Sequence, residues 1–306
     1  MRRAPILAAL LWAAACIPPE KPAQTAKKDC PKPPPEPEMY AMVLATIHEY
    51  HLSTSGYPFS KLGDAMDAFR PDLVLVDAPP EFVKEGRSEE ASVEVEYVKY
   101  VAATRAGDIE PIDTNRVDPP IMPVAEKEDE GTLQRDTSIL DTMDTMSFEQ
   151  ANSQEVGLKI LDALGTKARF QKGNPDFNRR EAWLEHNIDQ VIARRKPKRV
   201  LVVVDVVNRP SVEAHMFAMG AGVKSPIELV KVAKETREEG AVPSLVVKAW
   251  SQQLDRLRDR LSRMRKDSPE KQWLLQHQAV LQVAVDKQGA CCVSPERLRL
   301  PDKKQR

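Results

Sequence analysis

Histidine and carboxylate side chains directly follow apolar stretches of this chain, and their types could support chemistry. His48 ends the stretch over 40–47, His51 lies three residues later, and Asp77 and Asp113 end two further stretches. An imidazole can act as a general base, and imidazole nitrogens together with carboxylate oxygens bind divalent metals. His48, His51 and Asp77 could therefore bind one metal, or His48 and Asp77 could act in acid–base catalysis. The alternative is that each histidine is a hydrogen-bonded structural residue.

A predicted β-α-β unit positions His48 relative to Asp77. The residue pattern predicts a strand over 40–47, a helix over Phe59–Phe69 and a second strand over Leu73–Val76. The second strand is apolar throughout, which is typical of a strand buried on both faces. The carboxyl ends of parallel strands meet at one edge of the sheet, where open α/β proteins bind their ligands. We therefore expect His48 and Asp77 side by side at a site edge.

The strongest strand signal is the long β-branched run over 199–207, which predicts a strand at the centre of the sheet. Asp205 and Asn208 near its end join Asp113 as further candidates at the site edge. Further helices are predicted over 88–106, 153–164, 180–195 and around 250–264, and further strands over 109–113 and 279–285, the former at a sheet edge because of Pro111. Strands and helices that alternate in this way predict an α/β fold, with a central, mainly parallel sheet flanked by helices and a long C-terminal helix.

The N-terminus carries the signals of an exported, lipid-anchored protein. Arg2 and Arg3 precede the apolar run Ile6–Ala15, which is typical of a signal peptide and too short to span a membrane as a helix. The small residues before Cys16 resemble a bacterial lipoprotein processing box, although Ala13 stands where leucine is usual. Cys16 would then be the lipidated first residue of the mature chain and would anchor it to the cell envelope, at the outer membrane of a bacterium. The alternative is an ordinary signal peptide with an incidental cysteine.

These signals divide the chain into segments. We expect a signal peptide over 1–15, a lipidated cysteine with a linker over 16–38, a single α/β domain over 39–300 and a basic tail over 301–306. The linker is rich in proline, which disfavours helix and sheet and favours an extended spacer between the membrane and the domain. Within the domain, segment 118–150 combines prolines with an acidic run and is predicted to be an insert or cap.

Composition and missing motifs exclude several classes of function. The net charge is −1, and the basic patch at 196–199 has no interleaved aromatic residues, so nucleic acid is not an expected partner. The chain contains no serine-hydrolase elbow, no phosphate-binding glycine loop and no HExxH zinc motif. Cys30, Cys291 and Cys292 have no metal-binding spacing. They are either buried or free thiols, or one of the pair forms a disulfide with Cys30.

Three short motifs, taken in order and spacing, resemble those of a known superfamily. Residues 45–48 read ATIH, close to a Gly-x-x-His motif at the end of the first strand. Residues 69–77 read FRPDLVLVD, in which a strand after F-x-P-D ends in an acid, and residues 180–187 read REAWLEHN before the central strand. This order resembles the superfamily that contains Tiki proteases, TraB proteins, erythromycin esterases and haem-binding ChaN lipoproteins.

The resemblance implies an activity and roles for three residues. It implies a membrane-anchored, metal-dependent hydrolase, either a peptidase or an esterase, with a divalent metal as its cofactor. His48 would be the general base or a metal ligand, Asp77 its orienting or metal-binding carboxylate, and Arg180 a charge stabiliser.

The departures from this pattern weaken the catalytic interpretation. Ala45 replaces the glycine of the first motif, and Asp77 replaces the usual glutamate. The second Gly-x-x-His motif, which the resemblance implies after the central strand, reads DVVN over 205–208, so Asn208 stands in place of the second histidine. An amide is a poor transition-metal ligand compared with an imidazole. We therefore expect a degenerate domain that binds a small molecule or a protein partner without catalysis, with the hydrolase as the alternative.

Overall fold

A computed structural model of the chain describes residues 36–80, 91–105, 107–113, 138–170, 175–232, 242–264 and 268–289. The side chains of 166–170 and 175–181, within two helices, lie outside this description. The predicted signal peptide, the linker to residue 35, the four cysteines, the first part of the predicted insert and the basic tail also lie outside the described residues.

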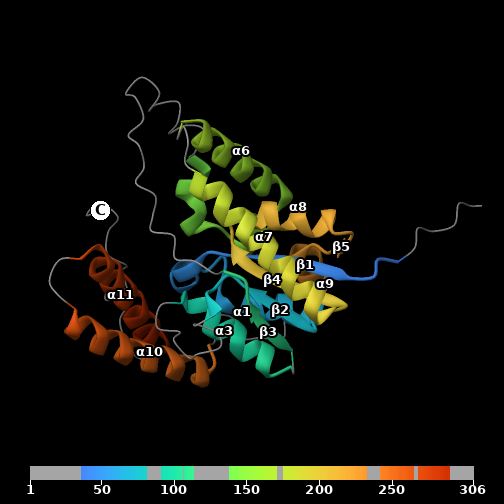
Figure 1. Cartoon of the computed structure of the whole chain (residues 1–306). Helices are drawn as coiled ribbons and strands as arrows, with labels where there is room; N and C mark the ends of the chain where they lie inside the picture. The colour runs from blue at the N-terminus through green and yellow to red at the C-terminus, as the bar shows by residue number, and fades with distance from the viewer. Residues whose placement is uncertain are drawn as a thin grey trace, which may run out of the picture. The chain divides into compact units, whose positions relative to one another are not determined.

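A five-stranded, all-parallel sheet lies at the centre of the described domain (Figure 1). Its strands follow the order β3-β2-β4-β1-β5 across the sheet. Their bounds are β1 (Tyr40–Thr46), β2 (Leu73–Val76), β3 (Asp108–Pro111), β4 (Arg199–Asp205) and β5 (Gly222–Val223). This arrangement confirms the predicted α/β class, the central place of the 199–207 strand and the edge position of the strand with Pro111.

Alternating side chains of the strands face two separate layers of helices. Met42 and Leu44 of β1 belong to one apolar cluster, and Ala41 and Val43 to the other. The larger cluster includes α1 (Phe59–Phe69), α3 (Val93–Ala103), α10 (Ser244–Arg263) and α11 (Pro269–Gly289), whereas the smaller one includes α7 (Pro175–Arg195) and α8 (Arg209–Ala218). Both faces of the sheet are therefore covered, which is why β2 and the middle of β4 are apolar throughout.

Shorter elements complete the described fold. They are the 3-10 helices η1 (His48–Leu52) and η3 (Ser138–Thr145) and the α-helices α5 (Phe148–Asn152), α6 (Gln154–Phe170) and α9 (Pro226–Val232). The described end of the predicted insert contributes Met146 and Phe148 to the larger cluster, with 3% and 1% of their surface exposed. This end of the insert is therefore part of the core. No helix among the described residues is long and apolar enough to cross a membrane.

The predicted strand over 279–285 is wrong, because these residues belong to α11. A short apolar run fits either a buried strand or one side of a helix. Leu274, Leu281 and Ala284 are fully buried at spacings of seven and three, which is a helical pattern. No glycine or proline interrupts the chain between Pro269 and Gly289, so the helix continues through the run.

Candidate functional site

His48 follows β1 with a backbone conformation that side chains rarely adopt. Its φ is 50°, and the other described non-glycine residues with a positive φ are Arg70 (52°) and Lys196 (47°). Arg70 and Lys196 follow the ends of α1 and α7, where a left-handed residue commonly terminates a helix. His48 instead begins η1, two residues after the end of β1. Such strained residues cluster at functional sites, so the backbone itself singles out His48.

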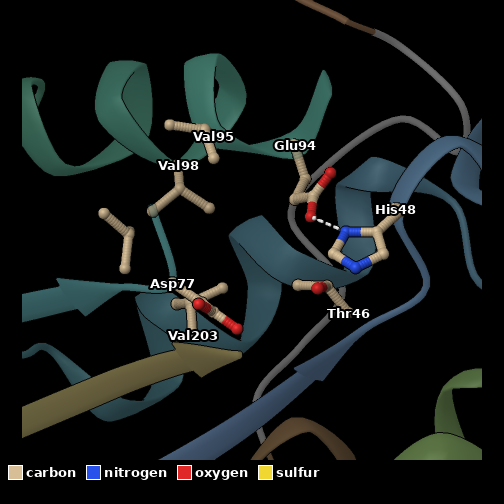
Figure 2. A pocket seen from close by; sticks show the side chains of 8 residues that line it. Thr46, His48, Asp77, Glu94, Val95, Val98 and Val203 are labelled. Carbon is tan, nitrogen blue, oxygen red and sulfur yellow. Dashed lines mark hydrogen bonds and ion pairs between the residues drawn. The ribbon is translucent and has the colours of Figure 1, made fainter. Parts of the chain in front are cut away.

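Two carboxylates bind the ring of His48, one at each nitrogen. Nδ1 lies 2.7 Å from Oε1 of Glu94, and Nε2 lies 2.7 Å from Oδ2 of Asp205. Figure 2 shows the first of these contacts. Glu94 comes from the first turn of α3, and Asp205 is the last residue of β4. We call these three residues the Glu94–His48–Asp205 triad.

Charges within the triad shift the pKa of each member. Burial alone would lower the pKa of His48, but the negative charges of Glu94 and Asp205 raise it well above 6.5. Burial alone would raise the pKa of Glu94, but the nearby imidazole lowers it to about 2. The pKa of Asp205 is also lowered, because His48 and the backbone N–H of Val207 outweigh its burial. At neutral pH the triad is therefore an imidazolium that donates to two carboxylates.

Asp77 does not lie on the strand next to His48, so the expected side-by-side placement is wrong. Strand β4 lies between β1 and β2, and the β-α-β unit therefore skips one strand position. Asp77 accepts a hydrogen bond from Nδ2 of Asn208, over 3.1 Å. Asn208, which follows β4, thus holds the Asp77 carboxylate.

His48 and Asp77 nevertheless line one pocket. It is small and partly open to solvent, with room for about one water molecule. Its lining residues are Thr46, His48, Val76, Asp77, Glu94, Val95, Val98 and Val203. In Figure 2 Val95 and Val98 lie above Asp77 and Val203, while Glu94, His48 and Thr46 close the other side. The expected site edge is thus a small pocket between the sheet and α3.

His51 has a structural environment, unlike His48. It is 4% exposed, and its Nε2 accepts a hydrogen bond from the backbone N–H of Ile47. Its Nδ1 lies 2.8 Å from the carbonyl oxygen of Tyr57, to which it donates. Burial lowers the pKa of His51 to about 4, so the ring is neutral. Both nitrogens are engaged by backbone, and the geometry does not support His51 as a metal ligand.

The other predicted site residues come from separate elements of the fold. Asp113 follows β3, and its backbone N–H donates to the carbonyl of Ala78. Arg180 lies in α7, and its side chain is outside the described residues. His215, a candidate to replace the missing second histidine near Asn208, lies 2.9 Å from Asp189 of α7 through its Nε2.

The donor arrangement does not fit the divalent metal that the resemblance implies. Among the described residues, no three histidine, cysteine, aspartate or glutamate side chains are arranged to hold a metal ion. A metal-binding imidazole offers one deprotonated nitrogen and directs the other to a hydrogen-bond acceptor. Both nitrogens of His48 face carboxylates at hydrogen-bond distance. Neither ring nitrogen of His48 is therefore open to a metal ion.

Glu94 is the site residue that the sequence did not reveal. A helix that follows a strand begins at the carboxyl edge of the sheet, so acidic residues in its first turn are natural candidates for a site there. Trp250 of α10 supports this turn, because its Nε1–H donates to the carbonyl of Val93, over 3.0 Å. Trp250 is fully buried, and so a helix from the C-terminal third fixes the position of Glu94.

On the side of β5, the end of β1 is bonded to side chains instead of a neighbouring strand. The short β5 pairs only with Tyr40 and Ala41. Further along β1, the N–H of Ala45 donates to Oδ1 of Asn152, over 3.0 Å, and its carbonyl accepts from the hydroxyl of Tyr57, over 2.5 Å. Asn152 and Tyr57 therefore satisfy the open edge of β1 just before His48.

Comparisons with known proteins do not assign this chain to a family. No family model, no curated protein and no solved structure matches it. The resemblance to the Tiki, TraB and erythromycin esterase superfamily therefore stays a prediction.

Proposed function

We propose that this chain is an envelope lipoprotein whose α/β domain binds a ligand without catalysing a reaction. The observation that carries the proposal is that carboxylates engage both ring nitrogens of His48. A general base needs an accessible nitrogen and a pKa near the working pH. His48 has neither property, because its ring is protonated and donates on both sides.

The described residues that line the pocket also offer no activated nucleophile for a hydrolytic reaction. Among its lining residues, the one hydroxyl belongs to Thr46, which donates to the carbonyl of Val204 over 3.3 Å. A nucleophilic hydroxyl would instead donate to a base. Asp77 accepts a hydrogen bond from Asn208, the residue that stands where the resemblance implies a second histidine. The contacts therefore favour a binding pocket over a hydrolase.

The membrane anchor is the second part of the proposal. Its support is the order of signal peptide, Cys16 and proline-rich spacer in the sequence. We expect metabolic labelling with palmitate to tag the wild-type protein and to fail in Cys16→Ser. We also expect the wild type to sediment with membranes and Cys16→Ser to stay in the soluble fraction. Labelling that persists in Cys16→Ser would contradict the anchor at this residue.

Direct observation of the His48 ring tests the absence of catalysis. Nitrogen-15 NMR of the histidine side chains should show both His48 nitrogens protonated at pH 7, whereas His51 should show one protonated nitrogen. Purified wild type and His48→Ala should both fail to hydrolyse peptide and ester libraries, with and without added Zn²⁺. Hydrolysis by the wild type that His48→Ala abolishes would overturn the proposal in favour of the hydrolase.

A further inference from the structure

The pair of helices α10 and α11, which form an antiparallel hairpin beside α3, carries an excess of positive charge (Figure 1). The described residues of this hairpin, 242–264 and 268–289, include seven basic and four acidic side chains. The whole chain, by contrast, has a net charge of −1. Positive charge is therefore concentrated on one part of the molecule, and an anionic partner would be attracted there.

Three arginines share one side of α10. Arg256, Arg260 and Arg263 follow one another at spacings of four and three, which places them in one row along the helix. Leu257 and Leu261 are buried against the rest of the domain, so this row flanks the packed face of α10. The side chains of Arg260 and Arg263 are 34% and 74% exposed, and the row therefore reaches solvent.

Trp273 of α11 lies on the same side of the hairpin as this row. Arg260 pairs with Glu270 over 2.7 Å, and Trp273, three residues after Glu270, shares its side of α11. Arg258 points to the opposite side, where it donates to Gln282. Trp273 is 44% exposed. An aromatic ring thus accompanies the row of cations, and we call the four residues the arginine–tryptophan face: Arg256, Arg260, Arg263 and Trp273.

This combination of residues suits the interface between a membrane and water. An indole ring is amphipathic and settles at the level of the lipid headgroups, while arginines are attracted to anionic headgroups. Asp259 and Glu270 pair with Arg263 and Arg260, yet the face and the hairpin both keep a net positive charge. A surface for single-stranded nucleic acid would offer successive aromatic rings along a groove, whereas this face has one ring. The residues therefore favour a membrane.

We propose that the arginine–tryptophan face binds the surface of an anionic phospholipid bilayer. This contact is separate from the lipid at Cys16 and goes beyond the proposed function. The hairpin has a firm base, because Nε1–H of Trp250 donates to the carbonyl of Val93 in the first turn of α3. A bilayer bound at this face would thus fix the orientation of the whole α/β domain on the membrane.

Co-sedimentation with vesicles tests this inference on the mature chain over 16–306, with Cys16→Ser to prevent lipidation. We expect binding to vesicles of equal parts phosphatidylglycerol and phosphatidylcholine, and none to phosphatidylcholine alone. Added salt should weaken the binding, because it screens exposed charges. Equal binding to the two kinds of vesicle would overturn the inference.

Paired charge variants show whether the face itself is responsible. Arg256→Gln combined with Arg263→Gln should weaken binding roughly twentyfold, since each arginine near an anionic surface contributes about fivefold. Lys159→Gln combined with Lys231→Gln removes the same charge from exposed positions on α6 and α9 and should leave the affinity nearly unchanged. Equal losses in the two double variants would show that net charge alone acts, and the proposed face would be wrong.

Tryptophan fluorescence reports on insertion of the ring. Anionic vesicles should shift the emission of the mature chain to shorter wavelengths, and Trp273→Phe should abolish the shift. Trp183→Phe, at a comparably exposed position of α7, should retain it. A shift that persists in Trp273→Phe would contradict the role of this ring.

Two further outcomes separate this inference from the proposed function. If the mature chain binds a single-stranded oligonucleotide and no vesicle, the membrane is the wrong partner, while palmitate labelling at Cys16 stands on its own. If labelling fails and the vesicles still bind through the arginine–tryptophan face, the lipid anchor is wrong and this inference stands.

Discussion

His48 and His51 lie three residues apart and have opposite environments. His48 has a strained backbone, a partly exposed side chain and carboxylates at both nitrogens, which hold it protonated. His51 is buried, neutral and bonded to backbone groups. The difference shows that residue type and spacing near a strand end do not decide the role of a histidine. The charges that the rest of the fold brings to each ring decide it.

The largest effect that this comparison predicts is on stability. His51→Ala should lower the free energy of unfolding by about 3 kcal/mol, because it leaves a cavity and two buried backbone groups without partners. Urea denaturation measures the change. His186→Ala, an exposed position on α7, is the matched control and should change stability by less than about 0.5 kcal/mol. Similar values for both variants would show that His51 is not structural.

The two histidines should make the free energy of unfolding depend on pH in opposite ways. The folded pKa of His51, about 4, lies below its ordinary value of 6.5. The contribution of His51 to the free energy of unfolding is therefore complete above pH 6.5. It falls by about 3 kcal/mol as the pH drops towards 4. The folded pKa of His48 lies above 6.5, so its stabilisation is complete below pH 6.5 and is lost as the pH rises through that folded value.

Urea denaturation between pH 4 and pH 9 tests this opposition. His51→Gln should flatten the acid side of the profile, and His48→Gln the alkaline side. An acid side that stays steep in His51→Gln would assign that loss to other groups. Glu94 is a separate contribution, because its pKa of about 2 lies below its ordinary 4.5 and its stabilisation is lost only between these values.

A smaller effect should come from the helix that supports Glu94. Trp250→Phe keeps most of the ring packing and removes the hydrogen bond to Val93, so stability should fall by about 1 kcal/mol. The less fixed Glu94 should also let the pKa of His48 fall, which an NMR pH titration measures. Trp273→Phe, at a partly exposed position of α11, should leave both quantities unchanged. A constant His48 pKa in Trp250→Phe would contradict the supporting role of α10.

The smallest effect on stability should come from one partner of His48. Asp205→Asn removes one of the two negative charges and should lower the pKa of His48, with less than about 1 kcal/mol lost because Asp205 is partly exposed. Asp189→Asn removes the carboxylate that faces His215 and should leave His48 unchanged. An unaltered His48 titration in Asp205→Asn would show that Glu94 alone sets its charge.

Local patterns were sufficient to predict much of the fold. The helix over Phe59–Phe69 and the strand over Leu73–Val76 have the predicted bounds, because Pro71 separates two clear apolar patterns. The run over 279–285 was misassigned because a short apolar stretch does not reveal its period. The carboxyl edge of the sheet was predicted correctly as the place where His48, Asp77 and Asp205 gather.

The contacts within the site depend on distant parts of the chain and could not be predicted locally. Strand β4 enters the sheet between β1 and β2, and nothing in the sequence near either strand indicates this. The bond from His48 to Asp205 joins residues 157 positions apart, and the bond from Trp250 to Val93 spans the same separation. The triad is therefore a property of the tertiary fold.

The placement of β4 between β1 and β2 also has a consequence for how the chain acquires its structure. Tyr40 pairs with Arg199 and Leu73 with Val200, so neither N-terminal strand gains its inner neighbour until most of the chain has been made. Such a high contact order slows folding, and unpaired apolar strands are prone to aggregate in the meantime. A polypeptide that emerges from its N-terminus would thus stay unfolded for most of its length, which is the state that the proposed export of this chain through a narrow channel would require.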